Sequence, residues 1–173
     1  GMASVFVGDM RSARFKEPFD AAFNSINSIG YLVSNEEIVS HLRVIADSMK
    51  PGGIYIVHLG CATESSDVGE PQLWTHERDG VQVTITWGGE GKDWKKKLSH
   101  QFCRMEINDC GKKLEFHDPH TMRLWLFEDW LSCIKCSERF VLEAVYNEEY
   151  EKISQGTPIT GSLGNLYYVL KSA

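Results

Sequence analysis

The sequence has no excess of positive charge. Its 173 residues carry 18 Lys and Arg against 24 Asp and Glu, a formal net charge of -6. A protein of this charge does not attract phosphate backbones or an anionic membrane through its overall field, so we predict no nucleic-acid or membrane partner. No apolar run approaches the roughly 20 residues that a membrane helix needs, and the first residues lack the basic head of a signal peptide. We therefore expect a soluble, cytoplasmic protein.

The sequence also lacks internal repeats, low-complexity segments and an even set of cysteines. Its five cysteines are odd in number and scattered, which is typical of a reducing compartment rather than of a disulfide framework. Cys133 and Cys136 have the CxxC spacing of some zinc sites. They fall in an amphipathic helical pattern, however, and no second CxxC accompanies them, so we predict no metal site.

The first third of the sequence has the pattern of an α/β fold. We expect strands over three apolar runs: Ala3–Val7, Phe19–Ile26 and Ile54–Leu59. Between the last two, Ser34 and Glu37 have the spacing of a capping box, which predicts a helix beginning there. The apolar stripe of this helix continues to Met49, and the segment Lys50-Pro51-Gly52-Gly53 should end it. Strand, helix and strand form a βαβ unit, so the flanking strands should be parallel neighbours.

After Leu59 the pattern becomes antiparallel. Asp79-Gly80 favours a two-residue hairpin between alternating strands, and a second turn is expected at Asn108–Gly111. A helix over Phe127–Ser137 and strands over Phe140–Tyr146 and Leu166–Leu170 follow. We expect a single domain, with an α/β core formed by residues 3–60 and 127–173 and an antiparallel insertion over residues 72–126.

The residues that follow parallel strands are the first candidates for a binding site, because ligands of open α/β sheets bind beyond the carboxyl ends of the strands. Asp9 follows the first predicted strand, and its carboxylate is a pure acceptor suited to an amine or a hydroxyl group. The alternative is an Asp that only forms a turn.

These motifs, in their order, resemble a known family. Gly8-Asp9-Met10-Arg11, the run from Phe19 to Asn24, Ser28-Ile29-Gly30-Tyr31-Leu32, the capped helix and Pro51-Gly52-Gly53 are similar to the C-terminal two thirds of a class I S-adenosylmethionine-dependent methyltransferase. The small-molecule and amino-sugar N-methyltransferases, which insert antiparallel strands after the Pro-Gly-Gly strand, are the most similar type. The resemblance implies a partial Rossmann-like sheet, from the family's third strand onward, with an antiparallel β-sheet lid.

The resemblance also implies roles for individual residues. Asp9 would accept from the adenine amino group of S-adenosylmethionine, and Met10 would offer its backbone N–H to the ring. Asn24 and Ser25 would lie beside the methionine part of the cofactor. The residues expected to face the acceptor substrate are Ser28, Tyr31, Trp74 and His76. Each has a structural alternative, since Asn24 and Ser28 can cap a loop and the aromatic residues can pack.

His58 is the candidate catalytic residue. The implied reaction is an in-line displacement at the sulfonium methyl group, and an amine acceptor must lose a proton. His58 lies at the end of a central strand, and imidazole titrates near neutral pH, so it is the histidine best placed to act as base. The alternative is a structural histidine bonded to a backbone carbonyl.

Two elements of the family pattern are missing. The glycine-rich turn after the family's first strand and the acidic residue that holds the ribose have no counterpart in this sequence. We therefore expect either methyl transfer to a small-molecule amine or, as the alternative, a non-catalytic methyltransferase-like subunit or oligomerisation module. The strand at Phe19–Ile26 should be left as an apolar edge. We expect that edge to pair with a second copy, giving a homodimer, or with a separate N-terminal fragment.

Overall fold

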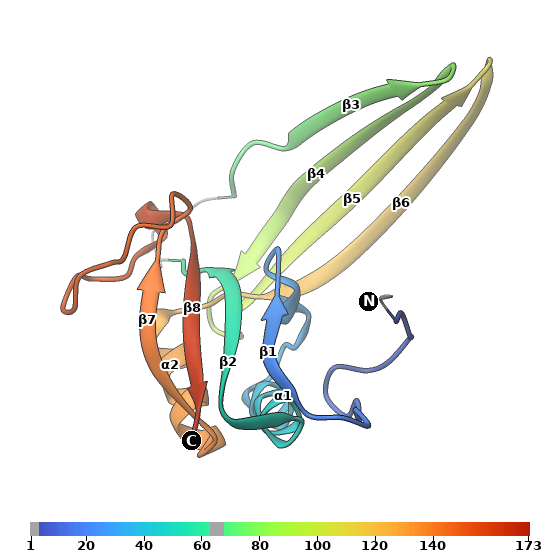
Figure 1. Ribbon diagram of the computed structural model, residues 1–173. Coiled ribbons are helices and arrows are strands. Elements are labelled where there is room, and N and C mark those ends of the chain that lie inside the picture. Colours follow the sequence, from blue (N-terminus) through green and yellow to red (C-terminus); the bar gives the residue numbers. More distant parts are fainter. Residues whose placement is uncertain (1–3, 63–67) are drawn as a thin grey trace. The chain divides into compact units, whose positions relative to one another are not determined.

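The computed structural model describes residues 4–62 and 68–173. The chain divides into two compact units, one formed by residues 1–63 and 125–173 and the other by residues 64–124 (Figure 1).

The first unit contains a four-stranded mixed sheet and two helices. The strands are β1 (Phe19–Asn24), β2 (Met49–Gly60), β7 (Phe140–Tyr146) and β8 (Asn165–Ser172). Their order in the sheet is β1-β2-β8-β7, with β1 parallel to β2 and the other pairs antiparallel. The helices are α1 (Asn35–Asp47) and α2 (Phe127–Ser137), and the short 3-10 turns are η1 (Ser28–Tyr31) and η2 (Gly161–Leu163). The predicted βαβ unit is confirmed.

Helix α1 begins at the predicted capping box. The Ser34 hydroxyl accepts from the Glu37 amide at 3.2 Å, and the Glu37 carboxylate accepts from the Ser34 N–H at 3.3 Å. These reciprocal bonds satisfy amides that the first helical turn leaves without intrahelical partners.

The helix ends earlier than the sequence predicts. Met49, expected on the helical stripe, instead begins β2 and pairs with Phe19. The segment expected to stop the helix is an irregular stretch within β2, because the register with β1 shifts between Phe19 and Ala21. Gly52 adopts φ 75°, and a Cβ on Gly53 would lie 3.1 Å from the Asp20 carbonyl oxygen. These glycines therefore permit a close backbone approach between the two parallel strands.

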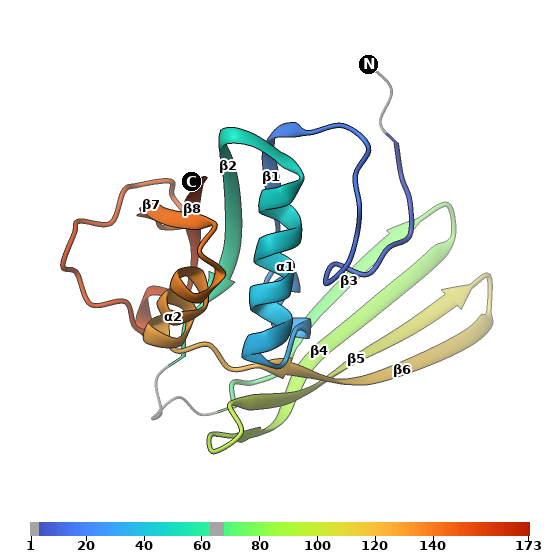
Figure 2. The ribbon, with the colours of Figure 1, turned by 90° about the horizontal axis from the view of Figure 1, so that it is seen from below.

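The core lies on the face of the sheet that the helices cover. Figure 2 shows α1 and α2 on the same side of this sheet. From Gly53 onward, the residues of β2 alternate between buried and half-buried positions, as a strand's period of two requires. Among the fully buried side chains of the helices and the sheet are those of Ile38, Leu42, Tyr55, Val57, Leu59, Trp130, Cys133, Leu166, Tyr168 and Leu170.

The second unit is an antiparallel sheet of four consecutive strands. These are β3 (Gln72–Arg78), β4 (Val81–Asp93), β5 (Leu98–Asp109) and β6 (Lys112–Arg123). The predicted Asp79-Gly80 turn is confirmed, with φ values of 53° and 80° that suit a two-residue hairpin. The second turn is tighter than expected, because Cys110 and Gly111 adopt φ values of 49° and 92° and the strands continue to Asp109 and from Lys112. That this sheet acts as a lid stays a prediction.

The predicted strand at Ala3–Val7 is wrong over its described residues. Residues 4–7 form no strand, and Val5 and Val7 are 96% and 104% exposed. A strand needs a neighbour to accept and donate its backbone hydrogen bonds, and within the described ranges nothing pairs with this segment. Phe6 makes an edge-to-face contact with Phe15, whose ring centroid lies 5.6 Å away. A short run of apolar and β-branched residues was therefore insufficient to make a strand.

Candidate functional site

A tight turn at Ser25–Ser28 follows β1 and is hydrogen-bonded to the carboxyl end of the neighbouring strand β2. The Ser28 amide donates to the Ser25 carbonyl at 3.0 Å and closes the turn. The Ile26 amide donates to His58 Nδ1 at 3.2 Å, and the Asn27 amide donates to the His58 carbonyl at 3.0 Å. His58, near the end of β2, thus holds the turn that follows β1 through both its ring and its backbone.

Asn24 and Ser28 use their side chains within the same turn. Asn24 Oδ1 accepts from the Ile29 amide at 3.0 Å, and the Ser28 hydroxyl donates to the Ser25 carbonyl at 2.7 Å. Both side chains thus cap the loop, which is the structural alternative given above for Asn24 and Ser28. Contacts of Asn24, Ser25 and Ser28 with a cofactor or an acceptor stay predictions.

The tautomer of His58 follows from its contacts. Because Nδ1 accepts from an amide, the neutral ring carries its proton on Nε2. The side chain is 14% exposed, and Nε2 lies 3.9 Å from a carboxylate oxygen of Glu148. Burial lowers the pKa of His58, and the charge of Glu148 opposes that shift. The ring also stacks on Tyr167, with centroids 4.6 Å apart.

Tyr167, which stacks on His58, is the centre of a group of aromatic side chains. Tyr167 of β8 stacks not only on His58 but also on Phe23 of β1 and on Tyr150, at centroid distances of 6.4 and 5.4 Å. Glu148 and Tyr150 belong to the connection between β7 and β8. No local sequence pattern marks these residues, because their proximity to His58 depends on the antiparallel pairing of β8 with β2.

The Asp9 carboxylate is bound by Arg11. It accepts from the Arg11 backbone amide at 2.8 Å and from the guanidinium at 2.6 to 3.1 Å. These hydrogen bonds from Arg11 lower the pKa of Asp9 to about 2. The same guanidinium donates to the Glu37 carboxylate at 2.7 Å. Arg11 therefore links the segment after the predicted first strand to the capping box of α1.

Met10 is held by a buried pair of side chains. His41 Nδ1 donates to the Met10 carbonyl at 2.8 Å, and His41 Nε2 accepts from the Tyr55 hydroxyl at 2.7 Å. Burial lowers the pKa of His41 and raises that of Tyr55. The sequence could have indicated that His41 is buried, because it lies beside Leu42 on the apolar stripe of α1. A buried histidine there needs two hydrogen-bond partners.

One face of α1 thus binds the segment at residues 9–11. Glu37, Ser40 and His41 are spaced at i, i+3 and i+4, and each contacts this segment. The third of these contacts is made by the Ser40 hydroxyl, which donates to the Arg11 carbonyl at 3.0 Å.

The remaining predicted site residues lie elsewhere. Tyr31 is at the end of η1 with its side chain 46% exposed. Trp74 and His76 are exposed residues of β3, in the second unit. The structure thus brings Asn24, Ser25, Ser28 and His58 together at the ends of β1 and β2, and it places Asp9 and Met10 beside α1. Acceptor contacts of Tyr31, Trp74 and His76 stay predictions.

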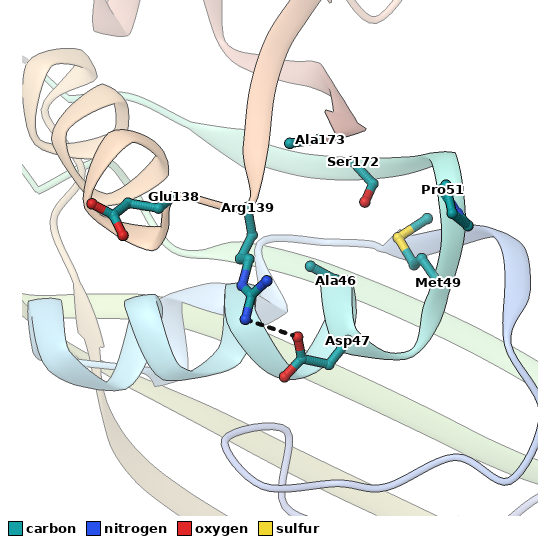
Figure 3. Close-up of a pocket in the computed structure, with 8 residues that line it drawn as sticks. All are labelled: Ala46, Asp47, Met49, Pro51, Glu138, Arg139, Ser172 and Ala173. Carbon is teal, nitrogen blue, oxygen red and sulfur yellow. Dashed lines mark ion pairs between the residues drawn. The ribbon is translucent and has the colours of Figure 1, made fainter.

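A shallow cavity of about 160 Å³ lies at the other end of β2, where this strand begins. Asp47 and Arg139 form an ion pair of 3.4 Å across it (Figure 3). Met49 and Pro51 line it from the first residues of β2, far along the strand from His58. This cavity is therefore separate from the predicted site.

Within residues 4–62 and 68–173, no three His, Cys, Asp or Glu side chains form a group that could hold a metal ion. Cys133 is buried and Cys136 exposed, both on α2. Neither helix of the described chain has the length and apolar character needed to cross a membrane.

Comparison with known proteins gives relatives at the levels of sequence and fold. No family model matches the chain. It is 34% identical over 133 residues to the dTDP-3-amino-3,4,6-trideoxy-alpha-D-glucopyranose N,N-dimethyltransferase of Streptomyces venezuelae, covering 71% of this chain and 51% of that protein. The chain thus spans about half the length of this curated relative.

Solved structures share the fold. DesVI of Streptomyces venezuelae has a TM-score of 0.74 at 22% identity, with 96% of this chain and 64% of that one covered. An S-adenosylmethionine-dependent methyltransferase of Clostridium acetobutylicum has a TM-score of 0.71 at 16% identity, with coverage of 95% and 62%. The predicted resemblance is confirmed: the chain has the Rossmann-like fold of class I S-adenosylmethionine-dependent methyltransferases, and its sequence is related to that of an amino-sugar N,N-dimethyltransferase.

Proposed function

We propose that this chain takes part in methyl transfer from S-adenosylmethionine to the amine of a small molecule. The observation that carries the proposal is the 34% identity, over 133 residues, to an enzyme whose name states that it methylates an amino sugar at nitrogen. The polar turn beyond β1 and β2 supports it, since ligands of open α/β sheets bind at that end.

Two features of the structure fit the cofactor. The Asp9 carboxylate, with its pKa lowered to about 2, stays ionised and is a pure acceptor for an amino group such as that of adenine. In the Ser25–Ser28 turn, the buried Asn27 Oδ1 has no hydrogen-bond partner among the described residues, and a ligand donor would satisfy it.

In this proposal the chain's residues bind and orient. Asp9 and the Met10 amide would hold the adenine, and Asn24 and Ser25 would line the methionine part. When bound, S-adenosylmethionine supplies an electrophilic sulfonium methyl group. Holding an amine at attack distance from such a group can account for roughly 7–11 kcal/mol of the barrier. The acceptor would be held by Ser28, Tyr31, Trp74 and His76.

The alternative of a non-catalytic module receives no support from the named relatives, which are methyltransferases. Pairing through the β1 edge, with a second copy or a separate N-terminal fragment, remains part of the proposal. On this edge Phe23 is 59% exposed, and among the described strands β1 pairs only with β2. Residence in the cytoplasm also stays a prediction.

Calorimetric titration with S-adenosylmethionine tests the cofactor site. We expect binding that Asp9→Asn weakens by about tenfold or more, since a hydrogen bond to a charged acceptor is stronger than one to a neutral acceptor. Asp20→Asn is the matched control, because Asp20 is also exposed and ion-paired, with Lys50 at 2.8 Å. Absence of binding at millimolar cofactor would refute the proposal that these residues suffice.

Transfer of a labelled methyl group to a dTDP-linked amino sugar, followed by mass spectrometry, tests the reaction. A product methylated at nitrogen is the expected result. Cofactor binding without any transfer to amines would contradict the proposed acceptor class and leave the cofactor site intact.

A further inference from the structure

The Ser25–Ser28 turn is strained. Ile26 and Asn27 adopt φ values of 54° and 51°, in the left-handed region that a β-branched residue such as isoleucine strongly disfavours. The Ile26 side chain is 81% exposed, so burial within the described chain does not compensate for this conformation. Such a turn persists only where surrounding contacts over-determine it, and strain of this kind clusters at functional sites.

Contacts to His58 supply that constraint from outside the turn. The ring accepts from the Ile26 amide through Nδ1, and the His58 carbonyl accepts from the Asn27 amide. The next two amides, of Ser28 and Ile29, donate to Ser25 and Asn24 within the segment itself. His58 is thus the residue of β2 that binds both left-handed positions.

The state of Nδ1 decides whether this arrangement holds. In the neutral ring Nδ1 is an acceptor and meets the Ile26 N–H; once protonated it is a donor, and two donors face each other. The groups facing the ring are the Glu148 carboxylate, 3.9 Å from Nε2, and the stacked phenol of Tyr167, on which Tyr150 stacks in turn. A general base would need a free lone pair on Nε2, which this tautomer does not provide.

We propose that His58 is a positioning residue rather than the catalytic base: its neutral ring clamps the strained Ser25–Ser28 turn, and protonation at Nδ1 releases it. The clamp is a property of this chain by itself. Only the statement that the turn forms part of a cofactor and acceptor site rests on the proposed function.

The tautomer can be read directly by multiple-bond ¹H–¹⁵N NMR of the full chain. At neutral pH we expect His58 to carry its proton on Nε2 with Nδ1 unprotonated. A ring protonated on Nδ1 at neutral pH would overturn the clamp, because that nitrogen could not accept from Ile26.

Amide exchange of Ile26 in matched variants tests the constraint. His58→Asn keeps an acceptor oxygen close to the position of Nδ1 and does not titrate, whereas His58→Leu removes the acceptor. We expect wild-type protection in His58→Asn and about tenfold or more faster exchange in His58→Leu, the loss expected for one hydrogen bond. Equal exchange in the two variants would refute the proposal.

Acidification provides a second comparison that does not need the leucine variant to fold. The measured exchange rate of the Ile26 amide is first divided by its intrinsic rate at each pH. The resulting protection factor should fall in the wild type as His58 becomes protonated. The same amide should keep its protection in His58→Asn. If the protection of Ile26 depends on pH in the same way in the wild type and in His58→Asn, the clamp is overturned.

Methyl transfer separates the clamp from base catalysis. A base is worth about 10²–10⁴-fold in rate, so a base role predicts that His58→Asn loses that factor. The clamp predicts that the methyl-transfer rate of His58→Asn stays within a few-fold of the wild-type rate and does not fall on acidification as the wild-type rate does. The rate of His58→Leu should be reduced. If the wild type transfers no methyl group, the proposed function fails, and the exchange experiments still decide the clamp.

Discussion

Arg11 engages both carboxylate oxygens of Asp9, with its backbone amide on Oδ1 and its guanidinium on Oδ1 and Oδ2. The guanidinium also donates to the Glu37 carboxylate, so this one side chain connects the segment at residues 9–11 to the N-terminus of α1. An adenine amino group that binds Asp9 must therefore share the carboxylate with Arg11.

Replacing Arg11 with Gln should raise the pKa of Asp9 from about 2 toward its ordinary value of 3.8, because the hydrogen bonds that favour the ionised form are lost. Since the folded-state pKa is depressed, the contribution of this pair to stability is present above about pH 4 and is lost as the pH falls through 2. NMR titration of the Asp9 carboxyl carbon measures the shift. Arg14→Gln is the control, and an unchanged Asp9 titration in Arg11→Gln would contradict the prediction.

Replacing Tyr55 with Phe should destabilise the chain by about 1–3 kcal/mol, because His41 Nε2 then becomes a buried acceptor without a donor. Tyr168→Phe is the matched control. Tyr168 is equally buried, but its hydroxyl contacts the weakly bonding Cys61 sulfur, at 3.2 Å. Urea unfolding should give the larger loss for Tyr55→Phe, and equal losses would show that the His41 contact adds nothing.

Stability should fall as the pH drops below about 6.5. The pKa values of His41 and His58 are both lowered by burial, so the unfolded chain binds more protons than the folded chain in this range, and stability rises with pH. Urea unfolding between pH 7.5 and 5.5 measures the slope. His58→Asn should reduce this slope, because one of the two histidines whose pKa is lowered is removed.

Ile26→Asn should stabilise the chain by about 1 kcal/mol. Asparagine tolerates the left-handed region better than a β-branched residue does, and the exposed Ile26 side chain loses little burial. Val141→Asn on β7 is the control, because Val141 is also an exposed apolar residue but lies in a strand, where asparagine is disfavoured. Thermal unfolding that shows no gain for Ile26→Asn would mean that the turn is not strained.

Local signals determined most of the elements. The Ser34–Glu37 box set the start of α1, Asp79-Gly80 set the hairpin between β3 and β4, and the periodicity over Phe127–Ser137 gave α2 with its observed bounds. Each of these signals acts between residues close together in the chain, so the sequence contains it in full. The parallel pairing of β1 with β2 followed from the same information through the short crossover.

Only the tertiary structure decided the contacts within the site. His41 reaches Met10 across 31 positions and His58 reaches Ile26 across 32, and no local pattern specifies such pairs. The segment before Gly8 had the composition of a strand, yet residues 4–7 form none, because a strand exists only with a partner to bind. The sequence by itself therefore determined which helices and hairpins form, whereas hydrogen bonding between distant elements decided the tautomer of His58 and the strained turn that His58 holds.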